Sequence, residues 1–305
     1  MRALLVVNPM ATMTTTRSRN VLTSALGSGL QLDVEPTKAR GHARELGEQA
    51  VDARYDVVVA LGGDGTVNEV INGLLARGPS PSVPALAIVP GGSTNVFARA
   101  LGITNHPVDA TSELLDALRE GRSRRIGLGQ ADGRWFTFSA GLGLDAATVR
   151  QVEDKCQQGR RKTSALYIRC ALREFYRFDR RHPQLTLSAP GIADQRLILG
   201  LVTNTDPWTF VNDKPLRPTP YASLTAGLDV LGMRSLGTVT ALGTLARWYA
   251  REPRPHGRHT MGLHDQTELT LRADGPLPFQ LDGEPLGDRT SVHFRGVPNA
   301  LRIVA

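Results

Sequence analysis

Residues 57–70 read VVVALGGDGTVNEV, and this stretch decides the fold of the first part of the chain. Its continuous apolar run is typical of a strand that is covered on both faces, as strands of parallel sheets are. Three glycines then surround Asp64, and apolar residues return at helical spacing after Thr66. We therefore predict a buried strand, a tight turn and a helix. Glycines let the backbone approach a ligand closely, and the amide groups at a helix N-terminus favour phosphate as that ligand.

A second corner of the same kind follows in residues 85–99, ALAIVPGGSTNVFAR. Ser93 and Thr94 can donate to phosphate oxygens, and Asn95 can bond to a base, a ribose or the backbone. The first corner does not end in Gly-Lys-Ser/Thr and lacks the G-x-G-x-x-G spacing, so it is neither a P-loop nor a dinucleotide fingerprint. The alternative is purely structural, with glycines that only make turns and polar side chains, Asp64 included, that only cap helices.

The surrounding sequence alternates strand and helix patterns. Helical spacing follows the first corner, and Thr37, with residues 41–43 ahead of Leu46 and Ala50, is expected to open another helix. The strands are expected at residues 4–7, 32–35, 57–61 and 85–89. This alternation predicts an α/β, Rossmann-like domain with a mostly parallel sheet. The two glycine corners should then converge on one cleft at the carboxyl ends of the strands.

The pattern changes beyond Gly121. One long helix is expected over residues 162–178. Short strands are expected at residues 135–139, 185–187, 197–203, 269–271, 279–281 and 292–294. Such strands, separated by Gly, Pro and Asp, predict a mainly antiparallel β domain. We place the boundary in the basic run 120–125.

The expected domains are therefore residues 1–122, an α/β domain, and residues 123–305, a β-rich domain. The last apolar run, residues 301–304, could pair in either domain.

Composition excludes several classes of protein. The 305 residues carry a net charge of +7, with 41% hydrophobic and 21% charged residues, which is typical of a globular chain and not of a disordered or rod-like one. The apolar runs are much shorter than the roughly 20 residues of a transmembrane helix. Cys156 and Cys170 are the only cysteines, too few for a disulfide framework or a zinc site, so we expect a cytoplasmic protein.

Taken together, these blocks resemble the catalytic domain of the diacylglycerol kinase family of bacterial lipid kinases, which sphingosine and ceramide kinases share. The resemblance rests on GGDGT-VNE and PGGSTNVFAR, and it extends over nearly the whole chain. The further blocks are Asn8-Pro9, Thr37, Gly41-His42-Ala43, residues 140–146 (AGLGLDA) and residues 280–284 (QLDGE). GGDGT alone also occurs in NAD kinases, so it indicates nucleotide chemistry better than it indicates the acceptor.

The resemblance implies that residues 1–122 bind nucleotide, that residues 123–305 bind the lipid substrate and that the active site lies between the two domains. It also implies roles for individual residues. Asp64 would lie by the triphosphate and its Mg²⁺. Asp145 and Asp282 would approach the reacting centre, and Glu284 would be the base that takes the acceptor's hydroxyl proton. The residues implied to bind ATP are Asn8, Thr37, Gly62, Gly63, Gly65, Thr66, Gly92, Ser93 and Asn95. On spacing alone, residues 282–284 also fit an ordinary acidic turn and Asp145 fits a helix cap.

Two positions depart from the family pattern. Val96 stands where the family commonly has Asp, which puts metal or ribose binding at that point in doubt. Ala226, ahead of Gly-Leu-Asp, replaces an Asp that serves some relatives at a separate structural Mg²⁺ site. We do not expect that second metal.

Residues 160–181 contain eight basic and two acidic residues, interleaved with apolar ones. Such a basic amphipathic segment can lie on an anionic membrane surface. It can equally be a solvated basic face with its apolar stripe in the core. The run 251–258 is expected to be a mobile basic loop. Nucleic acid is not an expected partner, because the sequence has no recognition motif beyond its charge.

We predict an ATP-dependent lipid kinase of phospholipid biosynthesis, most simply one that converts diacylglycerol to phosphatidic acid. One alternative is a kinase of another acceptor, such as a sphingoid base, another glycerolipid or NAD. Another is a nucleotide-binding regulatory module that has lost catalysis. The sequence leaves the acyl chains and the oligomeric state open.

Overall fold

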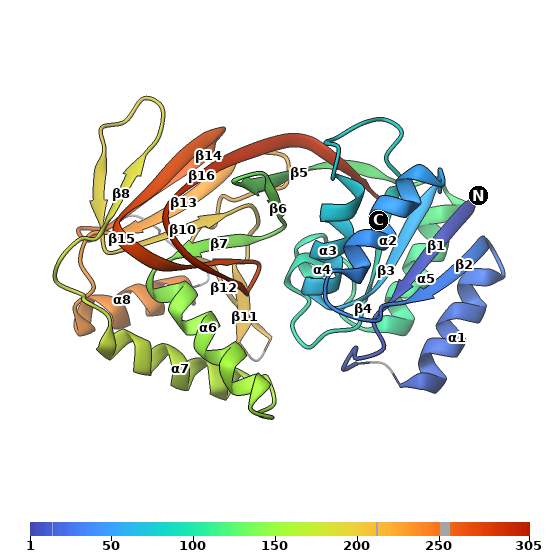
Figure 1. Cartoon of the computed structure of the whole chain (residues 1–305), viewed down its shortest axis with the longest axis horizontal. Helices are drawn as coiled ribbons and strands as arrows, with labels where there is room; N and C mark the ends of the chain where they lie inside the picture. The colour runs from blue at the N-terminus through green and yellow to red at the C-terminus, as the bar shows by residue number, and fades with distance from the viewer. Residues whose placement is uncertain (14, 212, 251–256) are drawn as a thin grey trace. The chain divides into compact units, whose positions relative to one another are not determined.

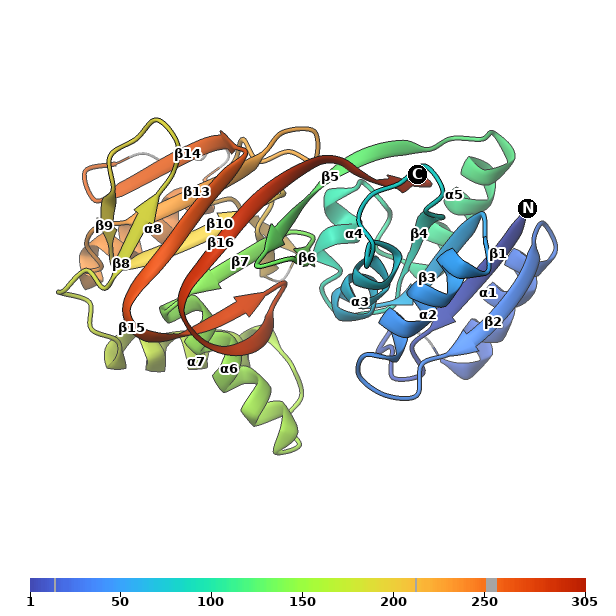
Figure 2. The ribbon, with the colours of Figure 1, turned by 45° about the horizontal axis from the view of Figure 1, so that its top comes forward.

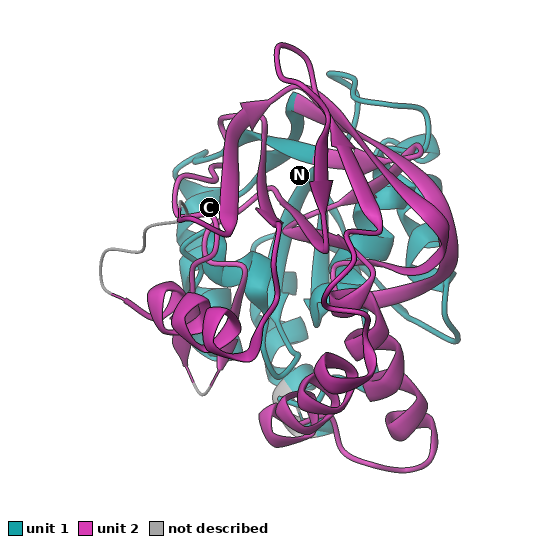
Figure 3. Ribbon diagram, turned by 90° about the vertical axis from the view of Figure 1, so that its left-hand side faces the viewer, with its two compact units in different colours: residues 1–128, 298–305 teal, residues 129–297 magenta. Residues whose placement is uncertain are grey.

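The computed structural model describes residues 1–13, 15–211, 213–250 and 257–305. It divides into two compact units, coloured separately in Figure 3: unit 1 is residues 1–128 with 298–305, and unit 2 is residues 129–297. The division into a nucleotide-binding domain and a lipid-substrate domain stays a prediction. Most of the run expected to be a mobile loop, residues 251–256, lies outside the described residues.

Unit 1 is built on a parallel sheet in the order β4-β3-β1-β2. Its strands are β1 (Arg2–Val7), β2 (Gln31–Pro36), β3 (Val57–Gly62) and β4 (Ala85–Pro90). Its helices are α1 (Thr16–Gly27), α2 (His42–Asp52), α3 (Asp64–Leu74), α4 (Val96–Ala100) and α5 (Pro107–Arg119). All four predicted strands are confirmed, and β3 and β4 are buried along their whole length, as their apolar runs require.

Helices cover both faces of this sheet (Figure 1). Alternate strand residues such as Leu5, Val59 and Ala87 pack with Leu22 of α1 and Leu114 of α5 in one core cluster. The residues between them point to the opposite face, where α2 and α3 pack together. The predicted doubly covered α/β fold is confirmed. The helix expected to open at Thr37 instead begins at His42, because the Thr37 amide still donates to Val7 O (2.8 Å) in the sheet.

Unit 2 is strand-rich and antiparallel, as predicted. Its sheet follows the order β14-β13-β10-β7-β15-β16, with β8 and β9 added beside β15, and β11 and β12 form a separate hairpin. The strands are β5 (Arg124–Ala131), β6 (Arg134–Phe136), β7 (Ser139–Leu142), β8 (Leu185–Ser188), β9 (Gln195–Leu197), β10 (Leu199–Thr203), β11 (Thr209–Val211), β12 (Lys214–Leu216), β13 (Leu228–Met233), β14 (Thr260–Gln266), β15 (Glu268–Leu281) and β16 (Glu284–Ile303). Its helices are α6 (Leu144–Gln157), α7 (Ser164–Arg177) and α8 (Thr238–Trp248).

Four strand predictions in unit 2 are wrong in their bounds. The strand expected at residues 135–139 is interrupted after Phe136, where main-chain amides turn to a carboxylate described below. The strand expected at residues 197–203 is two strands, because Leu197 pairs with β8 whereas Leu199 begins the pairing with β13. The strands expected at 269–271 and 279–281 are one irregular strand, β15, which forms a long hairpin with β16 (Figure 2).

The long helix expected at residues 162–178 is confirmed as α7, which the Thr163 hydroxyl caps by accepting from the Leu166 amide (3.2 Å). Strands β5 and β16 have residues in both units. The final apolar run returns to unit 1, where Ile303 pairs with Leu86 of β4.

Candidate active site

The residues predicted to bind nucleotide lie at the carboxyl edge of the parallel sheet of unit 1. Asn8 follows β1, and Thr37 follows β2. Gly62 to Thr66 form the β3–α3 corner, and Gly92 to Asn95 form the β4–α4 corner. Because β3 and β4 are neighbours, with Gly62 opposite Pro90, the two glycine corners lie side by side. This edge is where α/β sheets bind their ligands.

Close backbone contact between the two corners explains most of their glycines. The Gly91 amide donates to Gly62 O (2.8 Å), and a Cβ placed on Gly92 would stand 2.7 Å from the Gly63 Cα. Gly65 differs, because a Cβ there would meet no protein atom within 4 Å and its backbone does not have a positive φ. The fold therefore does not require glycine at position 65. A ligand that approaches the first turn of α3 would require it.

Helix α3 begins directly at the turn, and no side chain caps its N-terminus. The positive end of the helix dipole and the first amides of this helix are suited to an anion. Beside them, the Asn8 side-chain amide donates to the Thr66 hydroxyl (3.0 Å) and so joins the end of β1 to this turn.

Asp64 joins the two corners. Its carboxylate oxygens accept from the Val96 and Phe97 amides, each at 3.0 Å, and so cap the short helix α4. The structural role that the sequence left open for Asp64 is therefore present, although the helix capped is α4 and not its own. A carboxylate oxygen has two lone pairs and can accept from more than one donor.

Asn95 is buried and its side chain bonds within the protein. Its amide accepts from the Gly92 amide (3.0 Å) and donates to Gly92 O and Asn105 Oδ1 (both 2.7 Å), while its backbone has a φ of 50°. These bonds hold the second turn in shape. Ser93 in the same turn is exposed, and Thr37 is half-buried.

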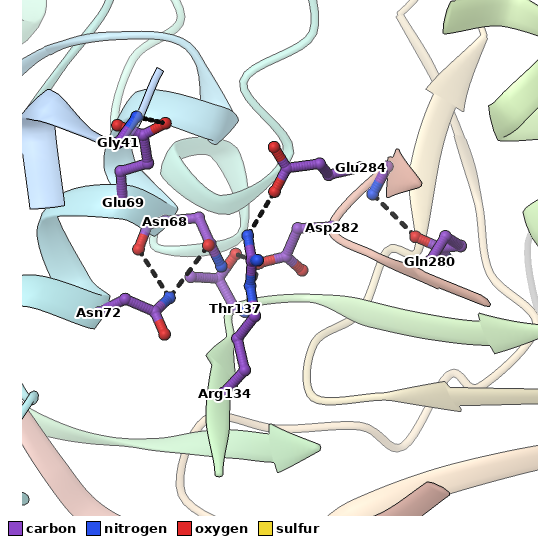
Figure 4. A network of polar contacts seen from close by, with 10 residues as sticks. Gly41, Asn68, Glu69, Asn72, Arg134, Thr137, Gln280, Asp282 and Glu284 are labelled. Atoms are coloured by element: carbon purple, nitrogen blue, oxygen red, sulfur yellow. Dashed lines mark hydrogen bonds and ion pairs between the residues drawn. The ribbon is translucent and has the colours of Figure 1, made fainter. Parts of the chain in front are cut away.

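Glu69 is a supporting residue that the sequence interpretation quoted without a role. Its two carboxylate oxygens accept from the Gly41 amide (2.9 Å) and the Ala43 amide (3.2 Å), so Glu69 of α3 caps the start of α2 (Figure 4). Asn68 is bonded to the side chain of Asn72 one turn later. This explains a structural need for the Asn-Glu pair that directly follows the glycine turn.

Val96, the departure from the family pattern, is buried and contributes only its amide to Asp64. At that position the chain therefore offers no side-chain ligand for a metal. Within the part of the chain that the structure describes, no group of three or more His, Cys, Asp or Glu side chains could hold a metal ion by itself.

In unit 2, Asp282 and Gly283 form the two-residue turn between β15 and β16, where Leu281 pairs with Glu284. Both turn residues have positive φ (48° and 74°), which is the type I′ geometry that Asp-Gly favours. The buried Asp282 carboxylate accepts from the Thr137 amide (2.7 Å) and hydroxyl (2.8 Å) and from the Phe138 (2.9 Å) and Ser139 (3.1 Å) amides. Burial raises the pKa of Asp282, and these bonds oppose that shift.

The saturated carboxylate of Asp282 explains the break between β6 and β7. The acidic-turn alternative left open by the sequence is therefore present. Its observed contacts favour a positioning role, in which Asp282 holds the hairpin that carries Glu284 (Figure 4).

Asp145 lies in the first turn of α6 and is linked to the same hairpin through Gln280. The Gln280 side chain donates to Asp145 Oδ2 (2.7 Å) and accepts from the Gly283 amide (2.9 Å). Burial raises the pKa of Asp145 to about 6, against the hydrogen bond from Gln280. A carboxyl group with this pKa changes charge near neutral pH, which is a property of acid–base residues.

Glu284 forms an ion pair with Arg134 at the start of β6, and the Glu284 side chain is 26% exposed. The pair is drawn in Figure 4. Arg134 and Gln280 received no individual role from the sequence. Gln280 stood in the quoted QLDGE block, whereas Arg134 has no local signal because its partner is distant in sequence. The structure therefore brings Asp145, Asp282 and Glu284 together around one hairpin.

The segment around Ala226 bonds within unit 2. The buried Asp229 carboxylate is 2.8 Å from His264 Nδ1 and accepts from the Asp265 amide (3.1 Å), and Asp265 in turn accepts from the Gly227 amide (2.6 Å). Burial raises the pKa of Asp229. The Asp229 carboxylate is thus bonded to groups of the protein itself.

The chain thus combines a parallel sheet that has two glycine corners at its carboxyl edge with an antiparallel sheet that carries an acidic hairpin. The family model of the diacylglycerol kinase catalytic domain matches residues 2–131. The resemblance inferred from the sequence is thereby confirmed over residues 2–131, which match the catalytic domain of the diacylglycerol kinase family.

Two curated relatives are diacylglycerol kinases. The one from Bacillus subtilis is 38% identical over 116 residues, which are 38% of this chain and 36% of the relative. The one from Staphylococcus aureus is 38% identical over 109 residues, which are 36% of this chain and 32% of the relative. The matched stretch thus spans about a third of the length of these relatives.

Solved structures resemble the fold of the whole chain. The crystal structure of a diacylglycerol kinase from Bacillus anthracis has a TM-score of 0.74 at 17% identity and covers 99% of this chain and 96% of that one. A second structure from the same organism has a TM-score of 0.78 at 18% identity with the same coverage. Both comparisons support the α/β unit followed by a strand-rich unit.

Proposed function

We propose that the protein is an ATP-dependent lipid kinase that transfers the γ-phosphoryl group to the hydroxyl of diacylglycerol and so produces phosphatidic acid. The observation that carries this proposal is the pair of glycine corners beside the uncapped first turn of α3, within a diacylglycerol kinase catalytic domain. The named relatives favour diacylglycerol over the other acceptors.

Unit 1 would hold the nucleotide. Gly65 leaves the open approach that a phosphate needs, and the α3 amides would donate to phosphate oxygens. Asn8 and Thr66 border this turn through their mutual hydrogen bond. The residues proposed to bind ATP are Asn8, Thr37, Gly62, Gly63, Gly65, Thr66, Gly92, Ser93 and Asn95, with Asn95 acting by shaping its turn.

Asp64 is the residue that would hold Mg²⁺. A Mg²⁺ ion that accompanies a nucleotide needs only one or two carboxylates, since phosphates and waters complete its shell. A single carboxylate at the glycine turn fits this need. The ion would supply positive charge where phosphoryl transfer develops negative charge.

Unit 2 would supply the carboxylates for the acceptor. We propose that Glu284 takes the proton of the acceptor hydroxyl while the new oxygen–phosphorus bond forms and the bond to the ADP oxygen breaks. Arg134 would hold Glu284 in position through their ion pair. Asp282 would position the hairpin, and Asp145 would act on it through Gln280.

The acceptor lies in a membrane, so we further propose that the protein works at the cytoplasmic membrane surface and contacts anionic lipid through residues 160–181. In the described part of the chain, no helix has the length and apolar character needed to cross a bilayer. In α7, the exposed basic residues Arg169, Arg173 and Arg177 are spaced by one helical turn each. Each cation near an anionic surface adds roughly 1 kcal/mol of attraction.

The test is transfer of labelled γ-phosphate from ATP with Mg²⁺ to diacylglycerol, monoacylglycerol, sphingosine or NAD in mixed micelles. Labelled phosphatidic acid is expected, and Asp64→Asn and Glu284→Gln should abolish it. Asp116→Asn, an exposed carboxylate of α5, is the matched control and should retain activity. Labelling of another acceptor instead would refute diacylglycerol as the substrate.

One observation favours a second candidate function, a nucleotide-binding regulatory module without turnover. Both Asp64 oxygens accept from main-chain amides, and Val96 adds no carboxylate beside them. Such a module would bind ATP, measured by calorimetry, and label no acceptor in the panel.

A further inference from the structure

Helix α8 exposes its apolar residues and buries a polar one. A surface helix of a globular protein normally turns its apolar stripe to the core. In α8 the exposed fractions are 86% for Val239, 64% for Leu242 and 40% for Leu245, whereas Thr244 is the residue that is fully buried. The sequence of α8 contains no acidic residue and one basic residue, Arg247. This outward apolar stripe requires an apolar surrounding.

Helix α7 exposes a similar stripe on the same layer of unit 2. Ile168, Leu172 and Tyr176, one turn apart, are 50%, 55% and 64% exposed. Figure 1 shows α7 and α8 on one side of the sheet. Both helices pack on one core cluster through their inner sides, with Phe175 from α7, Phe178 directly after it, and Ala241 and Trp248 from α8.

The outer sides of α7 and α8 therefore point away from a common core. We call them the α7–α8 face, defined by Ile168, Leu172, Tyr176, Val239, Leu242 and Leu245.

Positive charge lies beside this apolar surface. Arg169, Arg173 and Arg177 follow Ile168, Leu172 and Tyr176 by one position each, so basic and apolar residues form adjacent stripes on α7. The single acid of α7, Glu174, is mostly buried and accepts a hydrogen bond from Gln151 of α6.

Two more arginines stand where the helices meet. Arg180 lies over the ring of Phe175 at 4.3 Å and donates to the Thr238 hydroxyl (3.3 Å) at the start of α8. Arg180 and Arg181 line a cavity of about 480 Å³ together with residues 236–238. The Arg180 guanidinium is thus held between the two helices. The hollow has room for a phosphate group, and its lining includes one acidic residue, Asp179, beside the two arginines.

We propose that the α7–α8 face docks on an anionic lipid bilayer, with α8 lying in the surface and its apolar stripe inserted, and with the arginines contacting lipid phosphates. Apolar residues flanked by arginines match a bilayer, whose acyl region lies beneath a layer of negative headgroups. The inference extends the membrane contact in the proposed function, because it names α8, which carries almost no charge, as the inserting element.

The first experiment measures sedimentation with vesicles of phosphatidylcholine alone and of equal parts phosphatidylcholine and phosphatidylglycerol. The double variant Val239→Asp/Leu242→Asp is expected to bind the anionic vesicles at least about tenfold more weakly, because charged residues resist insertion. Val108→Asp, a 50% exposed valine on α5, is the matched control and should bind as the wild type does.

A second pair of variants tests the arginines. Arg180→Gln/Arg181→Gln should weaken the preference for anionic over neutral vesicles by about tenfold or more, because two cations are lost, while leaving the apolar contribution. Thermal unfolding checks that each variant is folded, and Val239→Ser/Leu242→Ser replaces the Asp variant if that one does not fold.

The inference is overturned if the α8 variants bind anionic vesicles as tightly as the control. It is also overturned if they change the oligomeric state in solution without changing vesicle binding, since the face would then join two copies of this chain. Kinase activity is a separate readout. Vesicle binding without phosphoryl transfer would refute the proposed function alone, and transfer with unaltered vesicle binding would refute the docking face alone.

Discussion

Replacing Asp145 by Asn is expected to stabilise unit 2 at neutral pH, although a polar contact is altered. Burial raises the pKa of Asp145 from 3.8 to about 6 in the folded state. Below pH 3.8 the carboxyl group is protonated in both states, and between 3.8 and 6 only the folded state keeps the proton. The stability that the protonated carboxyl contributes is therefore fully present below pH 3.8 and is lost as the pH rises through 6.

The magnitude follows from the same values. The interval between 3.8 and about 6 corresponds to about 3 kcal/mol, at about 1.4 kcal/mol for each pH unit. Asn keeps the shape and can still accept from Gln280, but it loses a negative charge in the first turn of α6, which is worth up to about 1 kcal/mol. We therefore expect Asp145→Asn to raise the free energy of unfolding by about 2 kcal/mol above pH 7.

Urea unfolding followed by tryptophan fluorescence is the assay. Trp135, Trp208 and Trp248 are the three tryptophans of the chain and all lie in unit 2, so the signal reports on this unit. The gain over the wild type should shrink steadily between pH 7 and pH 4. Asp154→Asn, an exposed acid on the same helix, should change stability by less than about 0.5 kcal/mol at every pH.

A variant Asp145→Asn that is less stable than the wild type at pH 7.5, or whose difference from it does not depend on pH, would refute the reasoning. If the variant is more stable but no longer transfers phosphate, the buried carboxylate is needed for activity although it lowers the free energy of unfolding.

Three further substitutions test other parts of the structure. Gly65→Ala should leave the thermal stability of unit 1 unchanged or raise it by up to about 1 kcal/mol, because a Cβ at this position has open space. The same variant should bind ATP about tenfold or more weakly in calorimetry, and an unchanged affinity would show that no phosphate approaches this turn. Glu69→Gln should destabilise unit 1 by about 1–2 kcal/mol, because an amide nitrogen would face a main-chain donor at the start of α2. Thermal unfolding followed by circular dichroism measures this loss, and an unaltered melting temperature would contradict the capping role. Gly143→Ala should lower the free energy of unfolding of unit 2 by about 1–2 kcal/mol, because the φ of Gly143 is 95° and a Cβ there would stand 3.3 Å from Phe178. Urea unfolding measures this loss, and a midpoint equal to that of the wild type would show that the turn relaxes.

The parallel sheet of unit 1 was predictable because its signals are local. Continuous apolar runs in residues 57–61 and 85–89 are typical of buried strands, and the glycines directly after them indicate turns. The adjacency of the two corners follows from sheet topology, so most of the proposed nucleotide site could be drawn from the sequence. The missing part is the use of Asp64 and Asn95 as internal bonding partners, which depends on tertiary contacts.

Unit 2 was harder to predict because long-range pairs decide its details. The break between β6 and β7 depends on Asp282, a carboxylate distant in sequence, and no local pattern near Thr137 predicts it. Arg134 gains its place from Glu284 in the same way. Helix α8 gave no expectation at all, since its apolar residues face outwards and do not follow the pattern of a helix that covers a core.

The return of β16 to unit 1 affects how the chain can fold during its synthesis. Val304 belongs to the core cluster of unit 1, and Ile303 is the partner of Leu86 on β4. All of unit 2 is synthesised before these residues, so until then β4 is an edge strand with open main-chain groups. Such an edge can pair with another nascent chain. The first unit to be translated is therefore the last to be completed, and chaperone demand should be greatest in that interval.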